Sequence, residues 1–165
     1  MGAKFFYFLD CATVFPSCFI MYNVSRFTED IPSLGAHMIT GVGIDLCRIS
    51  RIAVCLRRPG FEEKVFAERE RIYAKSMKNP AQHFAASFAV KEAFAKAGGW
   101  GIGKVGLKNV WLERTPTGPV IFLEDPARLL MESMGAEKIH VSLSHDGDNV
   151  VAVVLLEGGR QDVPL

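Results

Sequence analysis

The sequence from Pro80 to Gly99 reads PAQHFAASFAVKEAFAKAGG. It predicts one long helix, because alanine dominates it, Pro80 suits a first helical position and the pair Gly98-Gly99 supplies a left-handed stop. Small and apolar side chains share one face at helical spacing: Ala86, Val90, Ala93, Phe94 and Ala97. We therefore expect this helix to lie close against a sheet.

The opposite face of the predicted helix changes character along its length. It begins with phenylalanines and then carries Glu92 and Lys96. These two residues are four apart and are therefore neighbours on the helix surface. A charged group among alanines and phenylalanines is either half of a surface ion pair or part of a functional site.

Length and composition bound the class of protein. The chain has 165 residues, of which 49% are hydrophobic, and a formal net charge of +1. This is a globular profile, for one domain or for a smaller domain with an extension, and it argues against nucleic-acid binding. The four cysteines have neither Cys-x-x-Cys nor zinc spacing, so we expect reduced thiols in a cytoplasmic protein.

Residues 1–37 differ from the rest of the chain. The apolar run over 5–22 is interrupted by Asp10 and Pro16, which makes it a poor membrane span, and it lacks a secretory layout. We expect an extension of unknown role over 1–37, or a start assigned too early, followed by a domain over 38–157 and a flexible tail over 158–165. No stable membrane association is expected, although a tether over 5–22 stays open as an alternative.

The remaining chain alternates between strand-like and helix-like segments. A strand is expected over 39–46, and its Gly41 and Gly43 mark the close approach of another backbone or of a ligand. A helix should follow from about Ser50, with Ser50 as its N-cap. Further strands are expected over 105–112, 120–123, 139–144 and 150–156, the last of them central because it is apolar throughout. The predicted fold is α+β, a mostly antiparallel sheet wrapped around and packed on the long Ala-rich helix.

Two carboxylates stand out in this layout. Asp45 ends the first strand, and Glu92 lies midway along the long helix. Carboxylates delivered from separate elements suit Mg²⁺, which completes its coordination shell with water and phosphate oxygens. The alternative is structural: Asp45 would cap the next helix, and Glu92 would pair with Lys96.

The segment Ser142-Leu143-Ser144-His145-Asp146 ends a predicted strand. Adjacent strand residues point to opposite faces, so these residues do not simply form a hydrolase triad. His145 either binds a ligand at the strand end or only hydrogen-bonds the turn.

Four blocks resemble, in order and spacing, the holo-[acyl-carrier-protein] synthases, the 4'-phosphopantetheinyl transferases of fatty acid synthesis. They are GVGIDL at 41–46, FAVKEAFAKA at 88–97, GIG at 101–103 and SLSH at 142–145. The resemblance covers residues 38–157. It implies transfer of 4'-phosphopantetheine from coenzyme A to a serine of apo acyl carrier protein, which releases adenosine 3',5'-bisphosphate.

The resemblance also implies roles for the matched catalytic positions. Asp45 and Glu92 correspond to the family's Mg²⁺ ligands, and Lys91 and Lys96 fall where the family has lysines near the diphosphate. Lys96 would assist the leaving charge. The base for the serine proton is left open between Glu92 acting through a water and a water alone.

Binding roles follow from the same resemblance. Ser144 and His145 are expected in the coenzyme A pocket, and single-domain members are homotrimers with the active site between subunits. An arginine stripe on the helix after the first strand is expected to receive the acidic carrier protein: Arg48, Arg51, Arg57 and Arg58.

Two departures from the family pattern bear on this reading. The family commonly has Arg where this chain has Ser87, and Gly-Lys-Pro where it has Thr-Gly-Pro at 117–119. The first departure could weaken a phosphate contact or an interface pair, and the second alters a loop. A non-catalytic module that binds the carrier protein therefore stays as the alternative function.

Overall fold

The computed structural model describes residues 38–159, so the expectations for 1–37 and for most of the tail lie outside the described residues. The elements follow in the order β1 (Met38–Arg48), α2 (Ile49–Leu56), α3 (Phe61–Val65), α4 (Glu68–Ser76), α5 (Pro80–Ala97), α6 (Ile102–Val105), the 3-10 turn η1 (Leu107–Asn109), β2 (Val110–Thr115), β3 (Gly118–Leu123), α7 (Asp125–Glu132), β4 (Ala136–Asp146) and β5 (Asn149–Gly158).

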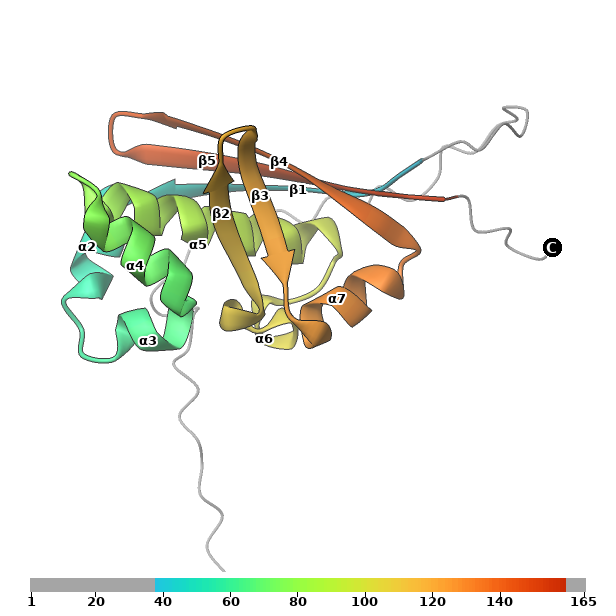
Figure 1. Cartoon of the computed structure of the whole chain (residues 1–165), viewed down its shortest axis with the longest axis horizontal. Helices are drawn as coiled ribbons and strands as arrows, with labels where there is room; N and C mark the ends of the chain where they lie inside the picture. Colours follow the sequence, from blue (N-terminus) through green and yellow to red (C-terminus); the bar gives the residue numbers. More distant parts are fainter. Residues whose placement is uncertain (1–37, 160–165) are drawn as a thin grey trace, which may run out of the picture.

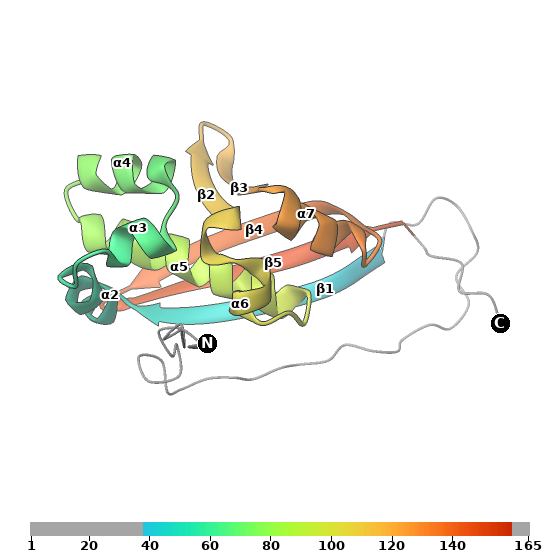
Figure 2. The same ribbon diagram turned by 90° about the horizontal axis from the view of Figure 1, so that it is seen from below.

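The main sheet has three antiparallel strands in the order β1-β5-β4. The strand over 150–156 is therefore central, as predicted, because its apolar side chains are needed on both faces. A second antiparallel pair, β2-β3, stands beside it. Helix α5 lies along one face of the main sheet (Figures 1 and 2), and the predicted α+β fold is confirmed.

The two glycines of β1 let the long helix approach the sheet closely. A side-chain carbon on Gly43 would lie 1.9 Å from the carbonyl oxygen of Ala93, and one on Gly41 would lie 2.1 Å from that of Ala97. The prediction of a close backbone approach is confirmed. It also fixes the position of Asp45, because the inward side of β1 alternates through Gly41, Gly43 and Asp45.

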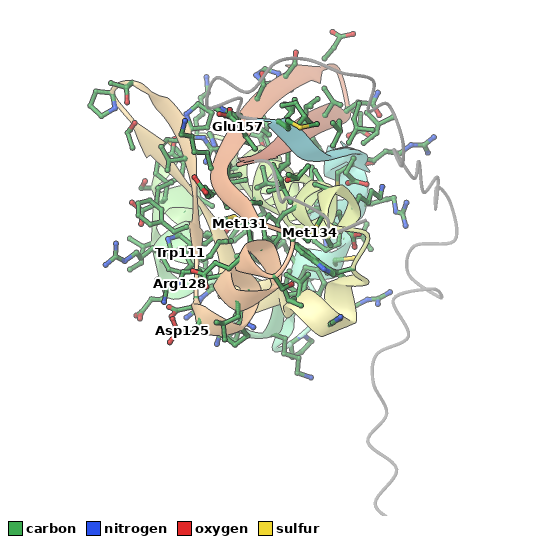
Figure 3. The ribbon with its side chains drawn as sticks, turned by 90° about the vertical axis from the view of Figure 1, so that its right-hand side faces the viewer. Trp111, Asp125, Arg128, Met131, Met134 and Glu157 are labelled. Carbon is green, nitrogen blue, oxygen red and sulfur yellow. The ribbon has the colours of Figure 1, made fainter. Side chains whose placement is uncertain are left out.

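Helix α5 is the core of the domain rather than one of its walls. It is buried on almost every side, because the sheet covers one face while α2, α4 and β2 pack against the others. Short α7 covers the far end of the molecule. In Figure 3, Met131 and Met134 lie toward the core, whereas the ion-paired Asp125 and Arg128 are on its outer side.

The described helices all lie on one side of the main sheet (Figure 2), and the other side carries exposed apolar side chains. Val42, Ile44 and Leu46 of β1 are 42%, 56% and 67% exposed. We call this the outer sheet face. No helix within residues 38–159 is long and apolar enough to cross a membrane.

Two local expectations were wrong. Helix α2 begins at Ile49, and Ser50 is not its cap: the Ser50 N–H donates to Asp148 Oδ1 of the β4–β5 turn at 2.8 Å. The strand expected over 105–112 begins only at Val110, because Gly106 takes a left-handed φ of 79° and the Asn109 side chain bonds the Val105 carbonyl, which favours a turn.

Candidate active site

Asp45 and Lys96 meet where β1 crosses the second half of α5. Lys96 Nζ donates to Asp45 Oδ1 at 2.7 Å. The side chains are 14% and 17% exposed, so the pair is mostly shielded but still reaches solvent. Within residues 38–159, Lys96 forms an ion pair with Asp45 and none is found between Lys96 and Glu92. The structural alternative of a Glu92–Lys96 pair is therefore not observed in this part of the chain.

Glu92 adds a second carboxylate beside this pair. Burial, and then the neighbouring charge of Asp45, raise the pKa of Glu92 to about 7, although Lys96 acts in the opposite direction. Burial also raises the pKa of Asp45 against the lowering effect of Lys96. Two desolvated carboxylates thus lie close enough to influence one another, and the charged form of Glu92 is disfavoured. We call Asp45 and Glu92 the acidic pair.

The acidic pair fits a hard divalent cation. The described residues contain no group of three or more His, Cys, Asp and Glu side chains that could hold a metal, so no closed protein cage is present there. Mg²⁺ does not need one, because it binds through one or two carboxylates and keeps positions for water and substrate phosphate. A bound cation would also offset the burial and the repulsion from Asp45 that raise the pKa of Glu92.

The thiol next to the acidic pair takes no part in this chemistry. Cys47 is buried and free, and burial, followed by the charge of Asp45, raises its pKa to about 12. It is therefore protonated at neutral pH and is neither a nucleophile nor a soft metal ligand. The expected reduced thiols are found at the two described cysteines, Cys47 and Cys55.

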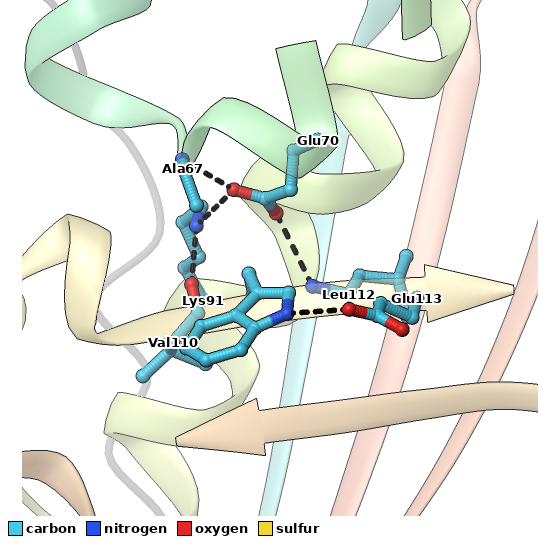
Figure 4. Close-up of polar contacts among 7 residues, drawn as sticks. Ala67, Glu70, Lys91, Val110, Leu112 and Glu113 are labelled. Carbon is cyan, nitrogen blue, oxygen red and sulfur yellow. Dashed lines mark hydrogen bonds and ion pairs between the residues drawn. The ribbon is translucent and has the colours of Figure 1, made fainter. Parts of the chain in front are cut away.

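The structure corrects the expectation for Lys91. This side chain is fully buried on another side of α5, where its ammonium pairs with Glu70 Oε2 at 2.7 Å and donates to the Val110 carbonyl. Glu70 in turn accepts from the N–H groups of Ala67 and Leu112, at 2.9 and 3.2 Å (Figure 4). The donors of Lys91 are used inside the core, so it is not free to bind a diphosphate.

Ser144 and His145 lie apart from the acidic pair within one chain. Asp45 is in register with Ala152 of β5, which is in register with Leu143 of β4. Two strand spacings put β4 about 10 Å from β1. Both residues are exposed, and they line a pocket between β4 and the first turns of α5.

This pocket contains two residues that the sequence reasoning missed. His83 reaches it from α5 and Arg114 from β2. A histidine next to Gln82 in the first turns of a helix that is otherwise rich in alanine and phenylalanine was a signal for the first. Nothing in the sequence pointed to the second, because only the packing of the β2–β3 pair brings Arg114 near α5.

The four arginines of the predicted docking stripe are only partly alike. Arg48, Arg57 and Arg58 are exposed around α2, whereas Arg51 is half-buried and its charge lowers the pKa of Asp45. The Asp148 contact to Ser50 ties the start of α2 to the β4–β5 turn. The helix that carries the stripe is therefore attached to the same sheet that carries Asp45.

Comparison with known proteins agrees with this layout. Residues 41–154 match the family model of the 4'-phosphopantetheinyl transferase superfamily. A holo-[acyl-carrier-protein] synthase of Syntrophus aciditrophicus is 42% identical over 125 residues, which are 73% of this chain and 98% of the relative.

Solved structures agree as well. The synthase of Neisseria meningitidis has a TM-score of 0.67 at 30% identity and covers 72% of this chain and 98% of its own. That of Bacillus anthracis, in complex with CoA (3',5'-ADP), has a TM-score of 0.62 at 34% identity and covers 73% and 98%. The chain belongs to the holo-[acyl-carrier-protein] synthases of the 4'-phosphopantetheinyl transferase superfamily.

Proposed function

We propose that the acidic pair and Lys96 carry the reaction of this enzyme family in this chain. That reaction transfers 4'-phosphopantetheine from coenzyme A to a serine hydroxyl of apo acyl carrier protein. The observation that carries the proposal is the meeting of two desolvated carboxylates with a single lysine where β1 crosses α5. Membership in an enzyme family favours this reaction over a non-catalytic carrier-binding module.

Asp45 and Glu92 would hold Mg²⁺, which supplies positive charge to phosphate oxygens when the bond to adenosine 3',5'-bisphosphate breaks. Lys96 keeps Asp45 oriented through its 2.7 Å contact and adds a second positive charge for the leaving phosphate. Arg51 of α2 adds a further positive charge that acts on Asp45. The close packing of β1 on α5 holds these groups in a fixed relation.

The proposal includes a homotrimer with the active site between subunits. It is supported by the outer sheet face, because Ile44 and Leu46 expose apolar side chains on a strand with no covering element among the described residues. It is also supported by the separation of Ser144 and His145 from the acidic pair within one chain, since a neighbouring copy could bring its β4 to this site. In this arrangement both residues contact coenzyme A.

Carrier docking completes the proposal. The exposed guanidinium groups of Arg48, Arg57 and Arg58 suit an acidic protein surface, and their contribution should weaken with salt. The substrates, coenzyme A and acyl carrier protein, are consistent with the expected cytoplasmic location.

Carrier loading tests the function directly. The full chain is incubated with coenzyme A and apo acyl carrier protein, with and without Mg²⁺ and chelator, and the carrier is examined by mass spectrometry. A mass gain equal to the phosphopantetheine arm, lost on chelation, is expected. Carrier binding without any mass gain would support the non-catalytic module instead.

The oligomer has its own test. Leu46→Glu places a charge on the outer sheet face and should convert the trimer to a smaller species in light scattering. Val120→Glu, an exposed apolar position on β3, is the matched control and should leave the mass unchanged. A wild-type chain that is monomeric at assay concentration would remove the trimer from the proposal.

A further inference from the structure

We propose that Asp148, on the turn between β4 and β5, is a positioning residue for carrier docking, because it holds the first turn of α2 and with it the arginine stripe. The inference deepens the proposed function and rests on it, since it assumes that α2 receives the carrier protein. Asp148 lies 98 residues beyond Ser50 in the sequence, yet its turn is at the same end of the molecule as α2 (Figures 1 and 2).

The start of α2 is bonded to this turn by three hydrogen bonds. The Ile49 N–H donates to the Asp148 carbonyl at 2.8 Å, and the Ser50 N–H donates to Asp148 Oδ1 at 2.8 Å. The Ser50 hydroxyl donates to Asp148 Oδ2 at 2.5 Å. One residue therefore satisfies the backbone donors of the first two positions of α2, which have no acceptor inside the helix.

Helix α2 does not cap itself. Its N-cap residue, Arg48, makes no side-chain capping bond, and its first turn contains no acidic residue. A carboxylate at a helix N-terminus accepts from the free N–H groups and also complements the helix dipole. Asp148 supplies both effects from a distant strand end. The hydrogen bonds from Ser50 lower the pKa of Asp148, so the group is ionised at neutral pH.

This cap bears on the stripe because of the residues at the start of α2. Arg48 directly precedes the helix, and Arg51 lies in its first turn. A helix of eight residues depends on tertiary contacts to stay helical. Without the bonds from the turn, the first turn of α2 would fray, and these two guanidinium groups would no longer be presented together with the rest of the stripe.

Charge and position predict opposite effects for Asp148. It is an exposed carboxylate, and the charge of Arg48 acts on it. If Asp148 acted only through its charge, its removal would strengthen the attraction between the stripe and an acidic carrier. If it positions α2, its removal weakens carrier binding even though the surface becomes more basic. The sign of the change therefore separates the two roles.

The experiment measures carrier loading by the full chain and its Asp148→Ala variant, with KM determined for apo acyl carrier protein and for coenzyme A. The KM for the carrier should rise roughly threefold to tenfold, because the docking-competent form of α2 is populated less. The kcat and the KM for coenzyme A should stay near their wild-type values. Asp148→Asn loses the same charge but keeps an acceptor for the Ser50 N–H, and it should restore most of the carrier affinity.

Asp146→Ala is the matched control. Asp146 is an exposed carboxylate at the end of β4, beside the same turn, and it has no hydrogen bond to α2 among residues 38–159. Its removal should leave the KM for the carrier unchanged or slightly lower. An unchanged or lower carrier KM in Asp148→Ala would overturn the inference, as would an Asp148→Asn variant that is impaired as strongly as Asp148→Ala.

Amide hydrogen exchange separates this inference from the proposed function. Asp148→Ala should speed exchange at residues 49–51 of the full chain, whether or not the chain loads a carrier. Unchanged exchange there would show that Asp148 does not hold α2. If the wild-type chain neither loads nor binds the carrier, the proposed function fails, while the exchange measurement still decides whether Asp148 caps this helix.

Discussion

Two lysines five residues apart on α5 occupy opposite kinds of environment. Lys91 is fully buried, and its ammonium and the carboxylate of Glu70 are surrounded by backbone partners from Ala67, Val110 and Leu112. Lys96 stays partly exposed and pairs with Asp45, while Glu92 beside it lacks full compensation. The first cluster is electrostatically complete, whereas in the second burial and the neighbouring Asp45 disfavour the charged form of Glu92.

This difference distinguishes a lysine with a structural role, Lys91, from a lysine proposed to act in the reaction, Lys96, on the same helix. A buried ion pair whose remaining lone pairs and protons are satisfied ties α4, α5 and β2 together and has no capacity for a ligand. Burial, and then a neighbouring carboxylate, raise the pKa of Glu92 to about 7, so its charged form is disfavoured until a cation binds. If the Lys91–Glu70 cluster is structural and the Asp45–Glu92–Lys96 cluster is functional, substitutions in the two clusters should differ in their effects on stability and on activity.

The largest effect on stability is expected at Lys91. Lys91→Met leaves the buried Glu70 carboxylate without its cation, and should lower the free energy of unfolding by about 3–5 kcal/mol. Chemical denaturation measures this value. Adding Glu70→Gln should recover part of the loss, because no uncompensated charge is then buried. A Lys91→Met chain as stable as the wild type would remove the contrast.

The largest effect on activity is expected at Asp45. Asp45→Ala should slow carrier loading by at least about 100-fold with the fold retained, because one of two metal-binding carboxylates is lost. Asp125→Ala is the control, since Asp125 is an exposed carboxylate paired with Arg128 on α7. Normal loading by Asp45→Ala in the presence of Mg²⁺ would contradict the assignment of the acidic pair.

Glu92 is expected to lower the free energy of unfolding of the metal-free chain. Its pKa is raised from 4.5 to about 7 on folding, so the folded state binds more protons between these values and stability falls as pH rises through them. Glu92→Gln should therefore stabilise the chelator-treated chain by about 1–3 kcal/mol above pH 7, with no gain below pH 4.5. Denaturation at pH 5 and pH 8 provides the measurement, and a gain that is larger at pH 5 would refute the sign.

The smallest effect is expected on the docking surface. Arg57→Gln combined with Arg58→Gln should raise the KM for acyl carrier protein a few-fold, because each exposed charge contributes about 0.5 kcal/mol or less in salt. The salt dependence of KM should flatten in parallel while the KM for coenzyme A stays unchanged. If salt affects the double variant as strongly as the wild type, the carrier docks elsewhere.

Much of the fold could be predicted because its signals are local. The boundaries of α5 follow from Pro80 at its first turn and from Gly99, which has a φ of 66°. The close packing of β1 follows from glycines in a strand, and the central place of β5 from its apolar run. The start of β2 was misjudged because Gly106 and Asn109 turn the chain within an otherwise strand-like segment.

In the site, too, some features follow from local sequence and others depend on how distant segments pack. From the residues alone it follows that Asp45 ends a glycine-containing strand, that Glu92 lies midway along an alanine-rich helix, and that such a strand allows a close backbone approach, which the structure shows against α5. The packing of distant segments was needed to show that Lys91 is a core residue while Lys96 is not, and that Arg114 and His83 line one pocket. The physical reason is that a charged side chain takes its role from the groups packed around it, and those groups come from distant parts of the chain.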